Sequence, residues 1–260
     1  MKTLSGILFA FAALSGAGTV LSAGTSSTGM NCTVVLISAN AEWKVVRSLR
    51  PDETYLSSPW GEFFKTRMGK GSRAKDVIFF HGGWGKVAAA GSTQYCIDRW
   101  KPVLMVNLGT CGGFRGDVSR YEILLVERTV IYDILEAMGD SKQAIADYET
   151  TLDLGWLGSD LPARVRRTLL VSADRDIVPS EIPALRGRYH AVAADWESGA
   201  IAYTCAKNRQ RLLILKGVSD LVASNSGGEA YGNLQVFESG CRVVMTELMD
   251  QLPKWLEKSP

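Results

Sequence analysis

The hydrophobic positions along the chain fall into short continuous runs separated by polar and glycine-rich segments. Runs that are rich in branched apolar residues and too short for helices predict strands that are buried on both faces. We predict such strands at residues 33–39, 77–80, 103–108, 123–134, 168–172, 191–194 and 212–218.

Between several of these runs, apolar residues recur at the spacing of a helix. Trp43, Val46 and Leu49, for example, fall roughly on one side of a predicted helix. Residues 51–74 carry Pro, Gly and Ser between aromatic residues, which predicts a loop or hairpin. Helices are predicted at residues 40–49, 87–100, 162–167, 197–208 and 234–252.

Strands that alternate with helices predict a largely parallel sheet with helices on both faces. We find no internal repeat and no linker, so we expect one domain over residues 32–255. The predicted fold class is α/β: a single-domain, three-layer α/β/α fold around a largely parallel, mixed central sheet. The ligand site of such a fold is expected beyond the carboxyl ends of its strands.

The first residues follow a different pattern. Met1-Lys2 precedes an apolar stretch from Leu4 to Leu21, and Ser22-Ala23-Gly24 then offers a cleavage site of small residues. This order predicts a signal peptide over residues 1–23, a short leader over 24–31, and export to the periplasm or the medium. If translation begins instead at Met30, the protein is cytoplasmic.

Charge and cysteine spacing argue against several classes of function. The chain has 29 basic and 27 acidic residues, so its charge gives no reason to expect nucleic acid or an anionic membrane as a partner. The five cysteines are scattered without a C-x-x-C pair, so we expect no metal and no cofactor. One disulfide is compatible with export, but the spacing assigns no pair. The chain also lacks the G-x-S-x-G signature of a serine hydrolase.

Polar and glycine-rich segments occur where the predicted strands end. Ser219-Asp220 directly follows the predicted strand 212–218, where partial burial would raise the pKa of the Asp220 carboxyl and suit a proton donor. The alternative is that Asp220 caps a turn. Glu197, at a predicted helix start, would bind a ribose diol or simply complement the helix dipole. Residue types alone leave both choices open.

Five segments in order show a family pattern: GWGKVAAA at 83–90, NLGTCGGF at 107–114, VSAD at 171–174, WESGAIA at 196–202 and KGVSD at 216–220. Together they resemble motifs of the purine nucleoside phosphorylase superfamily, above all its branch that hydrolyses methylthioadenosine and adenosylhomocysteine. The resemblance spans about residues 33–250 and implies a nucleoside phosphorylase-like fold.

The resemblance also implies roles for individual residues. Asp220 matches the catalytic acid that protonates the purine at N7, and Glu197 matches the residue that binds the ribose hydroxyls. The remaining implied substrate-binding positions are Gly109, Thr110, Cys111, Gly112, Asp176, Ile177, Trp196 and Ser219. The implied reaction is hydrolysis of the N-glycosidic bond of a purine nucleoside, which yields the free base and a ribose derivative.

Two positions depart from the pattern of that branch. Its water-orienting Glu is expected where Trp43 stands, and Glu42 is one residue early, a rotation of roughly 100° on a helix. We take Glu42 as the candidate second catalytic residue, which requires a shifted turn; otherwise it is a solvated first-turn acid. Asp176 stands where an aromatic residue usually stacks on the base, and Trp196 replaces a Met beneath the ribose.

Three hypotheses remain open at this point. Hydrolysis is favoured by the nucleosidase-like first segment. Phosphorolysis would need arginines to hold phosphate, and the candidates are Arg47, Arg115, Arg120 and Arg128. The third hypothesis is a nucleoside-binding or storage protein that has lost catalysis. In each case we expect a small-molecule nucleoside ligand, no membrane partner, and a homodimer or larger homo-oligomer by analogy with the family.

Overall fold

The computed structural model of the chain describes residues 31–71 and 74–259. The predicted signal peptide, residues 1–23, lies outside the described residues, and so does the predicted leader, 24–31, apart from Asn31. Within the described ranges, no helix is both long and apolar enough to cross a membrane.

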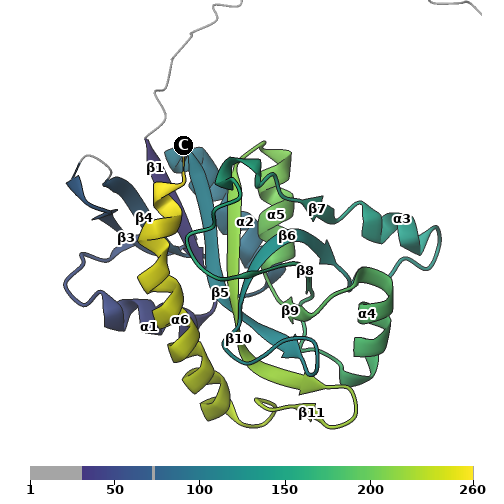
Figure 1. Cartoon of the computed structure of the whole chain (residues 1–260). Helices are drawn as coiled ribbons and strands as arrows, with labels where there is room; N and C mark the ends of the chain where they lie inside the picture. Colours follow the sequence, from purple (N-terminus) through teal and green to yellow (C-terminus); the bar gives the residue numbers. More distant parts are fainter. Residues whose placement is uncertain (1–30, 72–73, 260) are drawn as a thin grey trace, which may run out of the picture.

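Strands and helices alternate along most of the chain (Figure 1). Their order is β1 (Cys32–Ile37), α1 (Asn40–Leu49), β2 (Leu56–Ser58), β3 (Gly61–Met68), β4 (Lys75–His81), α2 (Gly85–Trp100), β5 (Leu104–Phe114), β6 (Ile123–Ile131), α3 (Ser141–Ala146), β7 (Glu149–Thr151), a 3₁₀ turn (Gly155–Leu157), β8 (Arg166–Ser172), a second 3₁₀ turn (Pro179–Glu181), α4 (Ile182–Tyr189), β9 (Ala193–Asp195), α5 (Ser198–Lys207), β10 (Leu212–Ala223), β11 (Gly227–Gly228) and α6 (Leu234–Glu257).

All strands join one mixed sheet. Its centre is parallel, in the order β4–β1–β5–β10. β10 then pairs antiparallel with β6, β6 and β8 are parallel, as are β8 and β9, and β9 returns antiparallel to β5. These pairings close β5, β10, β6, β8 and β9 into a ring. The predicted α/β class with a mixed central sheet is confirmed.

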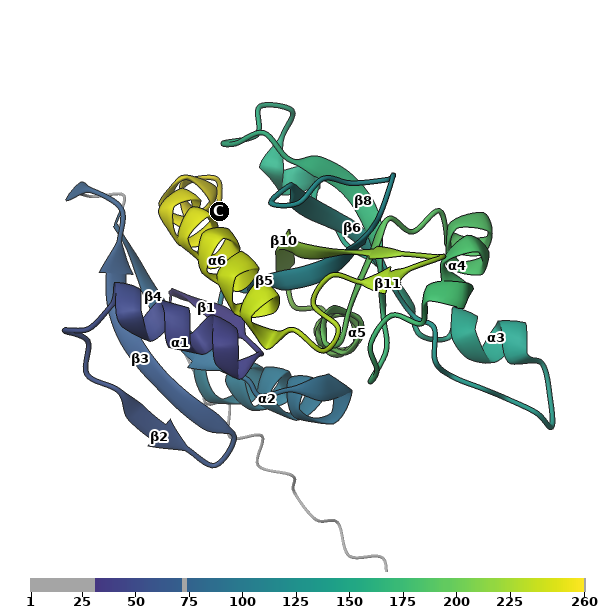
Figure 2. The ribbon, with the colours of Figure 1, turned by 90° about the horizontal axis from the view of Figure 1, so that it is seen from below.

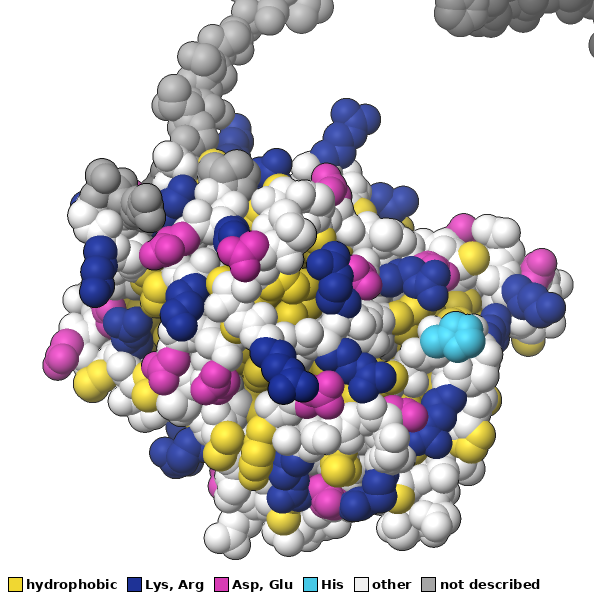
Figure 3. Space-filling model, in the orientation of Figure 1, with side chains coloured by type: hydrophobic (Ala, Val, Ile, Leu, Met, Phe, Trp, Pro, Cys, Tyr) yellow, Lys and Arg dark blue, Asp and Glu magenta, His cyan; other side chains and the backbone are white. Residues whose placement is uncertain are grey.

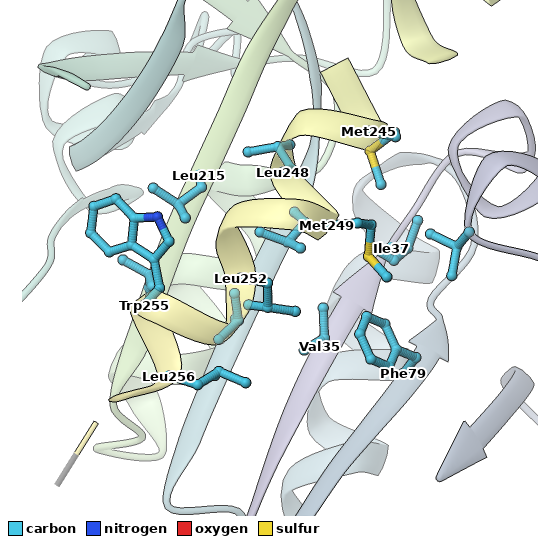
Figure 4. Close-up of a cluster of buried hydrophobic side chains, with 14 of the residues drawn as sticks. Val35, Ile37, Phe79, Leu215, Met245, Leu248, Met249, Leu252, Trp255 and Leu256 are labelled. Atoms are coloured by element: carbon cyan, nitrogen blue, oxygen red, sulfur yellow. The ribbon is translucent and has the colours of Figure 1, made fainter. Parts of the chain in front are cut away.

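Helices cover both faces of the sheet, as Figure 2 shows. Val35 and Ile37 of β1 face the cluster that contains α1 and α6, whereas Val34 and Leu36 face the cluster that contains α2 and α5. Successive residues of a strand point to opposite faces, so a continuous apolar run serves two cores at once. Figure 4 shows α6 packing Met249 and other side chains toward β1 and β4.

Two local predictions are wrong. No helix forms at residues 162–167: the chain there is irregular up to Arg166, where β8 begins. Leu161, Ala163 and Val165 all pack against the core, a spacing of two that suits extended chain. Leu49 was expected on the buried side of α1, but it is 39% exposed.

Two predicted strands run further than their apolar residues suggest. β5 continues through residues 109–113, beyond the predicted strand 103–108, and β10 continues through Asp220 to Ala223, beyond the predicted strand 212–218. Both extensions are held by neighbours, because β5 and β10 pair with each other as far as Phe114 and Val222, and Gly112 and Gly113 also pair with β9. Asp220 therefore lies within a strand, not after it.

Candidate active site

A cavity of about 460 Å³ opens at the carboxyl-end part of β5 and β10, beside the start of α1. This volume suits a small organic ligand. The cavity is lined by Ala39, Asn40, Ala41, Glu42, Trp84, Thr110, Cys111, Gly112, Arg175, Asp176, Ile177, Ala194, Asp195, Trp196, Glu197, Ser219, Asp220, Val222, Ala230, Tyr231, Gly232, Leu234 and Phe237.

All but one of the site residues named from the sequence line this cavity. The exception is Gly109, which lies behind the wall. A side chain at Gly109 would place its Cβ 2.7 Å from Glu42 Oε1 and 2.8 Å from Lys216 Nζ. A larger residue at position 109 would therefore displace the Glu42 carboxylate or the Lys216 ammonium from its present place.

Glu42 reaches the cavity although it is one residue early in the sequence pattern. α1 begins at Asn40, so Glu42 is its third residue, and its Oε2 accepts a hydrogen bond from the Ala39 N–H at 3.1 Å. Its Oε1 accepts from the Thr110 N–H at 2.5 Å and from the Thr110 hydroxyl at 2.8 Å. Glu42 is 3% exposed, so the interpretation as a solvated first-turn acid is wrong.

Trp43 occupies the expected place of the glutamate, but its side chain points away from the cavity, toward β3 and β4. It stacks on His81 with a centroid distance of 5.4 Å, and its Nε1 donates to Glu62 at 3.0 Å. The large indole thus anchors α1 to β3 and β4. With Trp43 fixed on that side, the preceding residue faces the cavity.

A buried ammonium group lies behind the glutamate. Lys216 Nζ is 3.0 Å from Asp195 Oδ2, and both side chains are almost fully buried. Burial opposes the charge of Lys216, but the carboxylates of Asp195, Glu42 and Glu197 raise the pKa of its ammonium above the ordinary value. Asp195 also accepts hydrogen bonds from the hydroxyls of Ser172 and Ser198. The network keeps one fixed positive charge among several acidic groups.

Glu197 stands at the start of α5 with its carboxyl group in the cavity wall. Its Oε1 accepts a hydrogen bond from the Gly85 N–H at 3.0 Å. Burial, with the nearby charge of Asp195, raises the pKa of Glu197 to about 8. The shift favours the protonated, uncharged form of Glu197 at neutral pH.

Asp220 enters the cavity through an irregularity in β10. Val218 pairs with Cys111 and Asp220 with Gly112, so Ser219 is an extra residue, as in a β-bulge. The Ser219 hydroxyl donates to Asp220 Oδ1 at 2.7 Å. Burial raises the pKa of Asp220 above its ordinary value, against the opposing effect of the Ser219 hydrogen bond. A carboxyl group with a raised pKa suits proton donation.

The wall beyond Asp220 combines polar groups from two loops. The Tyr231 hydroxyl donates to the Ile177 carbonyl at 2.5 Å. Asp176 makes no hydrogen bond or ion pair with the described residues and lines the cavity as a free acceptor. The resemblance gave Asp176 and Ile177, whereas Tyr231 carried no motif and was missed.

Two indoles form another part of the wall. Trp84 stacks on Trp196 with a centroid distance of 4.7 Å and an interplanar angle of 25°. Trp84 is 63% exposed. It precedes Gly85, which bonds to Glu197, so the indole pair flanks that carboxyl group. Trp84 lies within a glycine-rich segment that the sequence placed near the site, but its role was not predicted.

The arginines considered for phosphate binding are paired elsewhere. Arg115 and Arg120 both contact Glu229, Arg128 contacts Glu149, and Arg47 contacts Glu62. Among the described residues, one arginine lines the cavity: Arg175, which donates to Glu181 at 2.7 Å. Over the face drawn in Figure 3, basic side chains are interspersed with acidic ones.

This arrangement has the parts that a glycosidic bond cleavage needs. A buried acid at Asp220 is suited to protonate a leaving group, and Glu42 presents a carboxylate on the α1 side of the same cavity. Glu197 offers two oxygens for vicinal hydroxyl groups. Two carboxyl groups that flank one bond, with distinct acid and base roles, are the general solution for glycoside hydrolysis.

Comparison with known proteins gives one family. A family model described as the phosphorylase superfamily matches residues 33–249. The chain is 26% identical over 202 residues to a 5'-methylthioadenosine/S-adenosylhomocysteine nucleosidase from Buchnera aphidicola, covering 72% of this chain and 87% of that protein.

Solved structures agree on the fold. A nucleosidase of the same name from Neisseria meningitidis, in complex with methylthio-immucillin-A, superposes with a TM-score of 0.68 at 21% identity, covering 89% of this chain and 100% of that chain. The enzyme from Colwellia psychrerythraea, in complex with adenine, gives a TM-score of 0.66 at 18% identity and covers 89% and 97% of the two chains.

Proposed function

The chain belongs to the phosphorylase superfamily, and on this basis we propose that it is a nucleosidase that hydrolyses the N-glycosidic bond of a purine nucleoside. The substrate class is that of methylthioadenosine and adenosylhomocysteine, after relatives such as the one that is 26% identical over 202 aligned residues. The products are the free purine and a ribose derivative.

The observation that carries this proposal is that Asp220 and Glu42 line the same cavity. Asp220 donates its proton to N7 of the purine as the bond between base and C1' breaks. Glu42 accepts a proton from water as the water oxygen bonds to C1'. Glu197 holds the ribose hydroxyls, so the sugar stays fixed while positive charge develops on it.

The arginines favour water over phosphate as the nucleophile. A phosphorylase needs cationic groups free to hold phosphate beside the ribose. Here Arg115, Arg120 and Arg128 are all engaged by glutamates, and Arg175 is engaged by Glu181.

The deciding experiment measures base release from a panel of purine nucleosides, with and without phosphate. Release that is independent of phosphate, and that is lost in Asp220→Asn, supports the nucleosidase. Strict dependence on phosphate would instead identify a phosphorylase. Tight binding of a nucleoside without any turnover would identify a binding or storage protein.

Assembly and export are further parts of the proposal. The loop before α3 exposes Leu135 at 92% and Met138 at 97%, two apolar side chains suited to contact with a second copy of the chain. We expect a homodimer or larger homo-oligomer, which sedimentation would measure; a monomer at micromolar concentration would contradict it.

If the protein is exported, removal of the signal peptide leaves a mature protein that begins near Gly24. N-terminal sequencing of the secreted or periplasmic protein checks this.

A further inference from the structure

Asp220 lies on a hairpin whose return strand is very short. β10 pairs with β11 only through Val222–Gly228 and Ala223–Gly227. The next residue along, Glu229, donates its backbone N–H to the Leu221 carbonyl at 3.0 Å. A hairpin with so few backbone bonds needs other contacts to keep the neighbouring bulge in place.

On its other side, the bulge is held by α6. A Cβ at Gly240 would lie 2.2 Å from the Ser219 carbonyl oxygen, so only glycine allows the helix backbone to approach this closely. The backbone before Asp220 is therefore fixed by the core. The backbone after Asp220 faces the hairpin loop instead.

The Glu229 side chain holds the backbone that follows Asp220. Its Oε2 accepts from the Leu221 N–H at 3.0 Å and from Arg120 at 2.6 Å. Its Oε1 accepts from Arg115 at 2.5 Å. One carboxylate thus ties the residue that follows Asp220 to two guanidinium groups of the β5–β6 connection, through charge-assisted and directional bonds.

Several charged groups face Asp220 from the surrounding elements. Glu229 and Asp176 raise the pKa of the Asp220 carboxyl, and Arg120 lowers it, in addition to the larger effects of burial and of the Ser219 hydroxyl. Tyr231 and Cys111 also lie within electrostatic reach of Asp220. Glu229 itself is held ionised, since its pKa is lowered by the Leu221 N–H and by both arginines, against the effect of burial.

We propose that Glu229 is a positioning residue for Asp220: it fixes β10 after the bulge and neutralises Arg115 and Arg120 of the β5–β6 connection. The inference rests on the proposed function, because it requires Asp220 to act as the proton donor. Without the Glu229 carboxylate, the positive charge of Arg120 is no longer offset and favours the ionised form of Asp220, which cannot donate a proton.

Two variants separate the charge of Glu229 from its hydrogen bond. Glu229→Gln keeps an acceptor for the Leu221 N–H and removes the charge, so we expect the alkaline limb of kcat/KM to move to lower pH by about one unit. Glu229→Ala removes both, so we expect the same shift together with a fall in kcat of about tenfold or more, with KM little changed. Adding Arg120→Gln to Glu229→Gln should move the limb part of the way back.

The matched control is Glu127→Gln, which removes an exposed ion pair with Arg167 between β6 and β8, away from the cavity. We expect its pH profile and kcat to equal those of the wild type. A purely structural role for Glu229 would lower the thermal stability of Glu229→Ala without moving the alkaline limb in either variant.

The two proposals fail in different ways. Unchanged alkaline limbs in both Glu229 variants, with Asp220→Asn inactive, would overturn the role of Glu229 and leave the nucleosidase proposal standing. Full activity of Asp220→Asn would overturn the nucleosidase mechanism itself, whatever the Glu229 variants do.

Discussion

The two carboxyl groups proposed for catalysis lie in opposite kinds of surroundings. Glu42 receives three hydrogen bonds, two of them from backbone N–H groups, and lies between α1 and β5. The Asp220 carboxyl group accepts a hydrogen bond from the Ser219 hydroxyl among the described residues, and it lies beside a short hairpin. Backbone donors suit a carboxylate that accepts a proton only transiently, whereas sparse donors and burial suit an acid that starts out protonated.

In the proposed mechanism, the surrounding hydrogen-bond donors set the role of each carboxyl group more than its residue type does. The Glu42 side is built from regular elements that the core fixes. The Asp220 side combines a bulge, a short hairpin and surface ion pairs. We therefore expect the leaving-group side to respond more to changes in loops and pH, and the water side to respond more to changes in packing.

The largest expected effect is that of Asp220→Asn, which tests the leaving-group side of the comparison. The amide keeps the shape of the carboxyl group but has no acidic proton to give to N7. We expect kcat to fall on the order of 10²–10⁴-fold with nucleoside binding retained. Single-turnover base release and binding of a nucleoside, measured on the same preparation, check this.

Glu42→Gln tests the other carboxyl group, which is proposed to accept a proton from the attacking water. The amide cannot take a proton from water, and its NH₂ or oxygen must face the Thr110 N–H, so we expect kcat to fall by roughly 10²-fold. Base release under substrate saturation gives kcat. Glu149→Gln, which removes the ion pair with Arg128 outside the cavity lining, is the control. Full activity of Glu42→Gln would remove Glu42 from the mechanism.

A third test concerns the pH dependence of stability. The folded pKa of Glu197 is about 8, against an ordinary value of 4.5, mainly because of burial. The folded state thus holds a proton that the unfolded chain releases, so this stabilisation is complete below pH 4.5 and is lost as the pH rises through about 8.

Thermal unfolding across this range should show the loss in the wild type and a flatter curve in Glu197→Gln. The comparison of the two proteins isolates Glu197 from other titrating groups. If both proteins lose stability in parallel as the pH rises, Glu197 is ionised in the folded state and the assignment of its proton is wrong.

The smallest expected effect is that of Trp84→Ala at the mouth of the cavity. Trp84 is exposed and contributes one stacked face to Trp196, a contact of about 0.5–1.5 kcal/mol. We expect a modest rise in KM with kcat nearly unchanged, measured by steady-state kinetics. Trp60→Ala, at another exposed indole outside the cavity lining, should leave KM unchanged. A large loss of kcat in Trp84→Ala would place Trp84 in the catalytic machinery.

Much of the fold follows from the chain alone. The apolar runs at β1, β4 and β10 are buried on both faces, and this pattern is fixed by sequence because branched apolar residues at consecutive positions leave no solvent-facing side. The motifs at 83–90 and 216–220 likewise located Gly85, Lys216 and Asp220 near one site. The helix predicted at residues 162–167 is wrong, because Leu161, Ala163 and Val165 alternate at a spacing of two, which is typical of extended chain.

Only the tertiary structure decided which side chains from different elements come together at the site. The sequence placed Glu42 one residue out of register, and only the anchoring of Trp43 on His81 and Glu62 turns Glu42 into the cavity. Glu229 carried no motif, and its contacts with Arg115 and Arg120 join segments that are remote along the chain. The sequence determined which residues have the right chemistry, because that depends on residue type. The fold determined which of them meet and in what state of charge, because that depends on distance, burial and hydrogen-bond donors from other elements.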